Sequence, residues 1–264
     1  MKTARPLITP RRKTKLTSAA WEKIFQDIRA RIGWQAPPTT LAKISGYSLP
    51  GADSPHLPSD LPPDLPSVSQ VAAAHPGDPF RVLVSTMISL RTKDEVTHAA
   101  AERLFAKACT SAQLAALPEK EIADCIYPAG FYKTKAVHIR ETARRLTAEY
   151  GGKVPADREL LMAFPGVGRK TANLVLSLGF GIAAICVDTH VHRISNRLGW
   201  VETKTPEETE TALTGFLPKK YWIPVNETLV KFGQTVCTPT SPHCGSCPLS
   251  AKRCAKRGVT RTRD

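Results

Sequence analysis

Four cysteines near the C-terminal end of the chain have a spacing that suits metal binding. Cys237, Cys244, Cys247 and Cys254 are separated by six, two and six residues. Four thiolates from one compact segment can hold either a tetrahedral zinc ion or a [4Fe–4S] cluster. A zinc ribbon usually presents two close pairs, whereas this segment has one Cys-x-x-Cys pair, so the spacing favours the cluster and leaves zinc as the alternative.

A glycine-containing turn precedes two further candidate residues. The segment 157–179, DRELLMAFPGVGRKTANLVLSLG, predicts two short helices joined at Pro165. Glycine permits a tight turn and close approach by another backbone. Amide groups at such a turn can hold a phosphate oxygen without reading base sequence. An ordinary turn between helices is the alternative. The candidate DNA-contacting residues here are Gly166, Val167, Gly168 and Arg169.

Lys170 and Asp188 are the residues near this turn that could do covalent chemistry. Lys170 is expected in the first turn of the second helix, beside Arg169. A positive helix end and a guanidinium both disfavour the ammonium form and so favour a nucleophilic amine, although most lysines are simply solvated. Asp188 follows an apolar run at the start of the next helix, where aspartate usually caps the helix. A partly buried carboxylate can also stabilise a developing cation, and the two roles are compatible.

Helical periodicity predicts an all-α fold without strands. A first helix is expected over 18–33, from an N-cap at Ser18 to a stop at Gly33. The pattern is helical again from 71 to 181, and in the helix after Lys133 it places Lys135 largely away from the buried face. The residues expected on the buried stripe of the first helix are Trp21, Ile24, Phe25, Ile28 and Ile32.

Charge and cysteine usage narrow the class of protein. The 37 Lys and Arg against 23 Asp and Glu give a net charge of +14, which favours a polyanionic partner such as nucleic acid. We recognise no signal peptide, and the longest apolar run, 174–187, is too short and too interrupted to cross a bilayer. We therefore expect an intracellular protein without membrane association, cytoplasmic or nucleoid-associated in a bacterium. The three remaining cysteines are predicted to be buried small hydrophobic residues: Cys109, Cys125 and Cys186.

The segments FPGVGRKTANLVL and VDTHVHRISNRLG together resemble the motif of the endonuclease III family, within the helix–hairpin–helix glycosylase superfamily. The resemblance covers about 71–254, and the helix at 18–33 fits the N-terminal helix of the family. It implies a helical-barrel domain over 72–182 with the hairpin, and a [4Fe–4S] domain over 183–255 that packs with 17–34. The active site would lie in the cleft between them. The other expected segments are a basic arm (1–16), a proline-rich linker or insertion (35–71) and a basic tail (256–264).

The same resemblance implies a bifunctional DNA glycosylase and abasic-site lyase that removes oxidised pyrimidines. Lys170 matches the Schiff-base nucleophile and Asp188 the catalytic aspartate, and the four C-terminal cysteines match the cluster ligands. The implied partner is double-stranded DNA with damaged bases or abasic sites, bound by a monomer. A flipped-out base leaves a gap that such an enzyme must fill. The corresponding positions are Arg91 and Phe131, with His190 as a further DNA contact.

Two departures from the family pattern concern the cysteine segment. The spacing between Cys247 and Cys254 is one residue longer than usual. The loop 238–243 lacks lysine and arginine, and His243 is its one potential cation, so we do not expect this loop to bind phosphate strongly.

Three other functions fit parts of the sequence. A monofunctional mismatch glycosylase of the same superfamily would generally lack a lysine at the position of Lys170. A non-catalytic DNA-binding scaffold would explain the hairpin but not the pairing of Lys170 with Asp188. An electron-transfer protein would explain the cysteines but neither the hairpin nor the charge.

Overall fold

The structure, a computed structural model, describes residues 16–33, 66–250 and 252–263. The predicted basic arm, apart from Leu16, and the proline-rich segment up to residue 65 lie outside this range. Every regular element in the described residues is helical, and the one β-bridge joins His243 to Arg263. The prediction of an all-α fold is confirmed. No helix among the described residues is long and apolar enough to cross a membrane.

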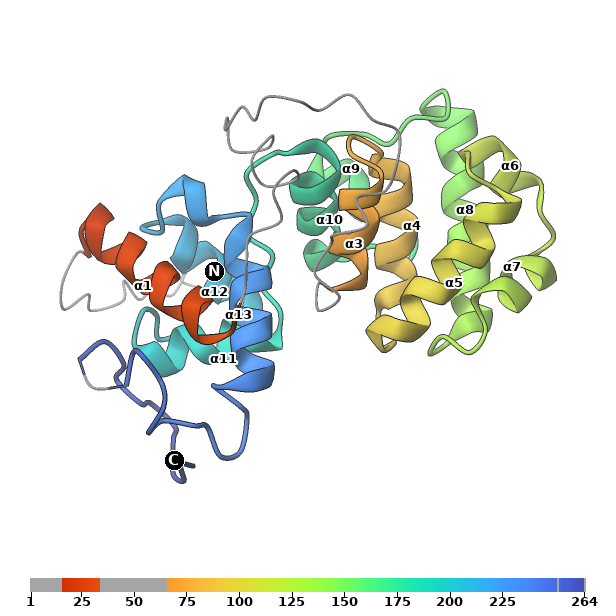
Figure 1. Cartoon of the computed structure of the whole chain (residues 1–264). Helices are drawn as coiled ribbons and strands as arrows, with labels where there is room; N and C mark the ends of the chain where they lie inside the picture. Colours follow the sequence, from red (N-terminus) through yellow and green to blue (C-terminus); the bar gives the residue numbers. More distant parts are fainter. Residues whose placement is uncertain (1–15, 34–65, 251, 264) are drawn as a thin grey trace, which may run out of the picture. The chain divides into compact units, whose positions relative to one another are not determined.

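The described residues form two compact units, shown in Figure 1. The hairpin unit comprises 66–186, and the cysteine unit comprises 16–33 together with 187–263. The helices of the hairpin unit are α3 (Ser67–Ala74), α4 (Pro79–Ser89), α5 (Asp94–Lys107), α6 (Ser111–Ala116), α7 (Glu119–Ile126), α8 (Tyr132–Glu149), α9 (Arg158–Met162), α10 (Arg169–Leu174) and the π-helical turn η1 (Val175–Gly179).

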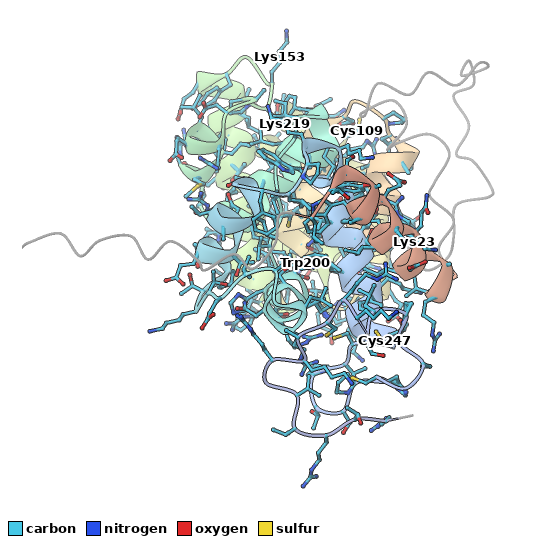
Figure 2. The ribbon with its side chains drawn as sticks, turned by 90° about the vertical axis from the view of Figure 1, so that its left-hand side faces the viewer. Lys23, Cys109, Lys153, Trp200, Lys219 and Cys247 are labelled. Carbon is cyan, nitrogen blue, oxygen red and sulfur yellow. The ribbon has the colours of Figure 1, made fainter. Side chains whose placement is uncertain are left out.

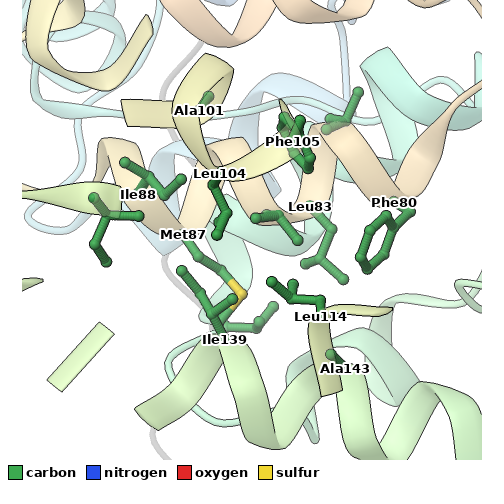
Figure 3. Packing of buried hydrophobic residues seen from close by; sticks show 14 of the residues in the cluster. Phe80, Leu83, Met87, Ile88, Ala101, Leu104, Phe105, Leu114, Ile139 and Ala143 are labelled. Atoms are coloured by element: carbon green, nitrogen blue, oxygen red, sulfur yellow. The ribbon is translucent and has the colours of Figure 1, made fainter. Parts of the chain in front are cut away.

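The core of the hairpin unit forms where α4, α5 and α8 pack together (Figure 3). Leu83 on α4, Leu104 on α5 and Ile139 on α8 are each fully buried in it. Helix α8 also packs against α6 and α7, while α4 packs against α10 and η1. The hydrophobic core therefore fixes the hairpin helix α10 and the start of α8 to the same central helix, α4.

Three details of the hairpin unit differ from the sequence-based expectations. Residues 67–71, expected in the linker, belong to α3, whose Val68 is buried in the core. Lys135 is 7% exposed, not solvent-facing, because it lies one helical turn before Ile139 on the buried side of α8. Cys109 is exposed, in the loop before α6. Its backbone N–H and its thiol both donate to the side-chain oxygen of Gln113, which caps α6. Cys125 and Cys186 are buried as predicted.

The cysteine unit is built around aromatic packing of the N-terminal helix α1 (Ser18–Arg31). Trp21 lies edge-on to Trp200 at 4.8 Å between ring centroids, and Phe25 stacks on Tyr221 at 4.2 Å. The N-cap of α1 is Thr17, not Ser18, because the Thr17 hydroxyl accepts the N–H of Ala20. The other helices are α11 (Thr189–Leu198), α12 (Pro206–Thr214), the 3-10 turn η2 (Lys219–Tyr221) and α13 (Pro224–Thr235).

The buried face of α8 provides a test of the core. Ile139→Ala should lower the free energy of unfolding by about 3 kcal/mol, because it removes buried methyl groups and leaves a cavity. Val137 is 45% exposed on the opposite side of the same helix. Val137→Ala should therefore change the free energy of unfolding by no more than about 0.5 kcal/mol. Denaturant unfolding of the two variants measures the difference, and equal losses would contradict this description of α8.

Candidate active site and cysteine centre

The hairpin turn between α9 and α10 is held tightly from one side. Gly166 has φ +76°, and a Cβ atom there would lie 2.7 Å from Nδ1 of His138 on α8. Val167 is buried and its N–H bonds the carbonyl of Phe164. Gly168 is the N-cap of α10 with an ordinary extended backbone, and a Cβ there would meet nothing within 4 Å. The two glycines therefore differ: Gly166 is required by the fold, whereas Gly168 leaves open space at the start of α10.

Lys170 is the second residue of α10 and is exposed. The first residues of a helix present backbone N–H groups that have no partner within the helix. Arg169, beside it, is half-buried. The amine of Lys170 thus projects from a helix N-terminus, as the sequence predicted.

Beyond η1 the chain runs back along α10 in an extended segment. Ser177 donates to the carbonyl of Ala184 at 2.9 Å, and Asn173 donates to that of Ile185 at 3.0 Å. One helical turn further toward the N-terminus of α10, the thiol of Cys186 lies 3.7 Å from the carbonyl oxygen of Lys170. These side-chain contacts satisfy carbonyls that a segment without a partner strand would leave unpaired. The chain therefore leaves the hairpin unit beside Lys170.

Asp188 begins the cysteine unit's helix α11 as its N-cap. Its Oδ1 accepts the N–H groups of His190 at 2.9 Å and Val191 at 2.8 Å. Among the described residues no donor reaches Oδ2, and the side chain is half-buried. The N-cap prediction is confirmed, and one oxygen of the carboxylate remains available for another partner. Lys170 belongs to the hairpin unit and Asp188 to the cysteine unit, so the pairing of the two stays a prediction.

His190 packs inside the cysteine unit. Its Nδ1 lies 3.2 Å from the guanidinium of Arg193. It also lies so close to Gly233 of α13 that a Cβ there would overlap it. The contact of His190 with DNA stays a prediction.

Arg91 and Phe131, from two different loops of the hairpin unit, lie together. The guanidinium carbon of Arg91 is 5.6 Å from the centre of the Phe131 ring, within cation–π range. Both residues are exposed, and Phe131 is 63% exposed. Both also have left-handed backbones, at φ 54° and 57°. Left-handed backbone at a non-glycine residue is unfavourable and is typical of functional sites.

Lys135 is the residue near this pair that the sequence analysis missed. Its ammonium donates to the carbonyls of Ile88 and Leu90, both at 2.6 Å, and to Oγ1 of Thr92 at 2.9 Å. Burial lowers the pKa of Lys135 to about 8. The available signal was its spacing, because position 135 falls on the same helical face as Ile139.

The four C-terminal cysteines are half-buried, and none forms a disulfide. Figure 2 shows Cys247 in the coil that follows α13. Burial raises the pKa of the Cys247 and Cys254 thiols, and the charges of the other cysteines of the group raise it further. The four sulfurs are therefore close enough to interact electrostatically. Within the described part of the chain, no three His, Cys, Asp or Glu side chains are arranged around one metal ion.

Arginine side chains hold this cysteine segment in place. Arg197 of α11 donates to the carbonyls of Thr238, at 2.6 Å, and Pro239, and lies 3.7 Å from the sulfur of Cys237. Arg193 donates to the carbonyl of Cys237 at 3.0 Å. Four free, partly buried thiols from one segment are a donor set that fits a thiolate-bound iron–sulfur group.

The comparisons with known proteins agree with this fold and motif. Residues 84–219 match the family model described as HhH-GPD superfamily base excision DNA repair protein. The fold and the hairpin thus define a helix–hairpin–helix protein of this repair class. Endonuclease III of Thermotoga maritima is 52% identical over 172 residues, which cover 65% of this chain and 81% of the relative. This chain belongs to the endonuclease III family.

Two solved structures support the same assignment. A trapped covalent intermediate of endonuclease III with DNA superimposes with a TM-score of 0.64 at 39% identity, and the match covers 68% of this chain and 84% of that one. A non-covalent endonuclease III–DNA complex also has a TM-score of 0.64, at 33% identity, with 88% and 95% covered. These structures show that the family fold extends over most of this chain.

The two hairpin glycines allow a matched test of the turn. Gly166→Ala should lower the free energy of unfolding by about 2 kcal/mol, because the new methyl group meets His138 and the backbone is left-handed. Gly168→Ala should cost less than about 1 kcal/mol, since its backbone is ordinary and its surroundings are open. Thermal or denaturant unfolding compares the two. A Gly166 variant as stable as the Gly168 variant would show that the turn is not fixed by His138.

Proposed function

We propose that this protein is a bifunctional DNA glycosylase and abasic-site lyase, with Lys170 as the nucleophile and Asp188 as its electrostatic partner. One observation carries the proposal. The chain returns along α10 until Cys186 reaches the carbonyl of Lys170. Asp188 follows two residues later, and two residues of chain span at most about 7 Å. Chain continuity therefore keeps the backbone of Asp188 within that reach of Cys186, and this supports the pairing of Asp188 with Lys170 that the family motif implies.

The proposed reaction begins at the sugar of a flipped-out damaged nucleotide. The neutral amine of Lys170 attacks C1′, the glycosidic bond breaks, and the base leaves with its electron pair and takes up a proton. The sugar ring opens at its C1′–oxygen bond to give an iminium between C1′ and the lysine nitrogen. Loss of a proton from C2′ then expels the 3′ phosphate and nicks the strand. Water finally hydrolyses the imine and frees Lys170.

Asp188 has the geometry for two tasks in this scheme. Its Oδ1 is fixed by two N–H groups of α11, so the position of the carboxylate is set by the helix. Its Oδ2, which lacks a donor in the described residues, can face the positive charge that develops at the sugar. The same oxygen can accept the proton that Lys170 must lose before it attacks.

The remaining parts of the proposal concern DNA binding and lesion choice. The turn at Gly166–Arg169 would bind a backbone phosphate through N–H groups at the start of α10. Arg91 and Phe131 would enter the gap left by the flipped base. Oxidised pyrimidines in double-stranded DNA are the proposed substrates of a monomeric, intracellular enzyme, in line with the family. The proposed domains are a helical-barrel domain (72–182) and a cluster domain (183–255 with 17–34).

We further propose that Cys237, Cys244, Cys247 and Cys254 hold a [4Fe–4S] cluster. When bound, the cluster would cross-link the segment that follows α13. Arg197 supports this proposal because its guanidinium contacts the sulfur of Cys237. The loop 238–243 is tied back to α11 by the same arginine, so its lack of basic residues fits a structural role better than phosphate binding.

Trapping with borohydride tests the nucleophile. Incubation with a duplex that contains an oxidised pyrimidine or an abasic site, in the presence of borohydride, should give one covalent protein–DNA adduct, because the reagent reduces the iminium. Lys170→Gln should abolish the adduct. Lys153 is an exposed lysine of the same unit (Figure 2), and Lys153→Gln should leave the adduct yield unchanged. Adduct formation by the Lys170 variant would overturn the assignment.

Metal analysis tests the cysteine centre. The purified protein should be brown and contain about four iron atoms and no stoichiometric zinc. Cys247→Ser should lose most of this iron and lower the melting temperature, because it removes one ligand of the cluster. The matched control is Cys125→Ser, a buried cysteine of the hairpin unit, which should keep the iron. One zinc ion per chain, or full iron content in the Cys247 variant, would contradict the cluster proposal.

A further inference from the structure

The surface around Arg91 and Phe131 consists of two turns that come from distant parts of the chain. The first turn, 90–93, follows α4, and the second turn, 127–131, precedes α8. Arg91 occupies the first and Phe131 the second, and their side chains are in cation–π contact. Tyr127 in the second turn is 59% exposed and lies edge-on to Tyr132, so aromatic surface continues beside the pair.

The two turns are joined by Lys135. Its ammonium bonds the carbonyls of Ile88 and Leu90, which precede Arg91, and the hydroxyl of Thr92, which follows it. Lys135 itself belongs to the first turn of α8, and its N–H bonds the carbonyl of Phe131. One side chain therefore fixes the backbone on both sides of Arg91 relative to the helix that begins after Phe131.

Thr92 completes this connection. Its Oγ1 accepts both the ammonium of Lys135 at 2.9 Å and the N–H of Gly130 at 3.1 Å. A Cβ at Gly130 would overlap the carbonyl oxygen of Arg91, so the two turns touch through their backbones. Strained left-handed residues persist only where the surroundings hold them. These contacts supply that restraint for both Arg91 and Phe131.

Lys135 has no carboxylate partner among its contacts, and its position is costly. All three acceptors are uncharged, and burial lowers the pKa of the amine. An ammonium at the C-terminal end of α4 is partly compensated by the carbonyl ends of that helix. Because burying the Lys135 ammonium without a carboxylate is unfavourable, its presence here indicates that the arrangement of the two turns that it holds is required.

We infer that Lys135 is a positioning residue for DNA binding, whose ammonium locks the two turns so that Arg91 and Phe131 enter the duplex as a preformed pair. This inference rests on the proposed function, because it assigns the pair to the gap opposite an extruded base. Preorganisation reduces the entropy lost when side chains are ordered on binding. A loosened pair would therefore bind lesion-containing duplex more weakly, while the chemistry at Lys170 would be untouched.

The test uses a duplex with an uncleavable tetrahydrofuran abasic analogue opposite 2-aminopurine, whose fluorescence reports on stacking in the gap. Lys135→Met keeps the length and apolar stem of the side chain but removes the ammonium. It should bind this duplex about tenfold more weakly than the unaltered protein and lose most of the fluorescence change. Lys135→Arg keeps a cation and should recover part of the affinity and part of the fluorescence change. Lys153→Met, which removes an exposed charge from the same unit, should match the unaltered protein.

A double-mutant cycle separates positioning from general weakening. In the normal background, Arg91→Ala and Phe131→Ala should be coupled, so that the double variant loses little more affinity than the worse single variant. In the Lys135→Met background the two losses should become independent. Thr92→Val removes the shared hydroxyl at nearly constant shape, and it tests the same connection if the Lys135 variant folds poorly. Independent losses in the normal background, or unchanged binding and fluorescence in both the Lys135 and Thr92 variants, would overturn the inference.

Lyase activity on a single-stranded abasic oligonucleotide distinguishes the two levels of the proposal, because this substrate has no gap to fill. Lys135→Met should retain this activity within about twofold if Lys135 acts through the two turns alone. Loss of the single-strand activity by this variant would overturn the positioning role. Absence of lyase activity in the unaltered protein would instead refute the proposed function, and the binding measurements would still report on Lys135.

Discussion

Four helices of this protein, α4, α7, α9 and α13, have basic side chains that satisfy carbonyl groups at or near their C-terminal ends. The last carbonyls of a helix have no partner within it, and burying them unpaired is costly. Lys135 bonds the end of α4, and Arg103 bonds the carbonyl of Cys125 at the end of α7. Arg145 bonds Ala163 after α9, and Arg193 bonds Gly233 near the end of α13. In each case the cation comes from a neighbouring helix, so each contact attaches the end of one helix to another helix.

Because some basic residues are used inside the fold, the net charge overstates the number of cations on the surface. A charge of +14 predicts attraction to a polyanion, but it does not say which basic residues face the partner. Arg197 is 7% exposed and Lys135 is equally buried, and both bond backbone carbonyls of their own unit. Lys170 and Arg91, by contrast, are exposed and stand beside helix ends. The basic residues therefore include buried ones that hold loops in place and others that are exposed to solvent.

The sequence predicts those parts of the structure that depend on short segments. The hairpin turn at Gly166, the exposed amine of Lys170 and the N-cap at Asp188 each follow from a few adjacent residues, and the all-α fold follows from periodicity. The contacts of Lys135 could not be found in this way, because its acceptors lie 43 to 47 residues earlier in the chain. The contact between Arg91 and Phe131 is equally non-local. Helical spacing puts Lys135 four residues before Ile139, on the same face of α8, so at position 135 spacing indicates burial better than charge does.

The two kinds of helix end carry different parts of the proposed activity. Lys170 and Asp188 lie at the N-terminal ends of α10 and α11, where unpaired N–H groups attract anions and can fix a carboxylate. Arg91 lies just beyond the C-terminal end of α4. There the ammonium of Lys135 bonds the carbonyl of Leu90 and holds the backbone as it leaves the helix. Chemistry at the sugar needs a charge held at a fixed point, which a helix N-terminus provides through its N–H groups. Filling a gap in the duplex needs a side chain that projects from the surface on a rigid turn. Lys135 meets that need because it satisfies the carbonyls at the end of α4 and leaves the side chain of Arg91 facing solvent beside Phe131.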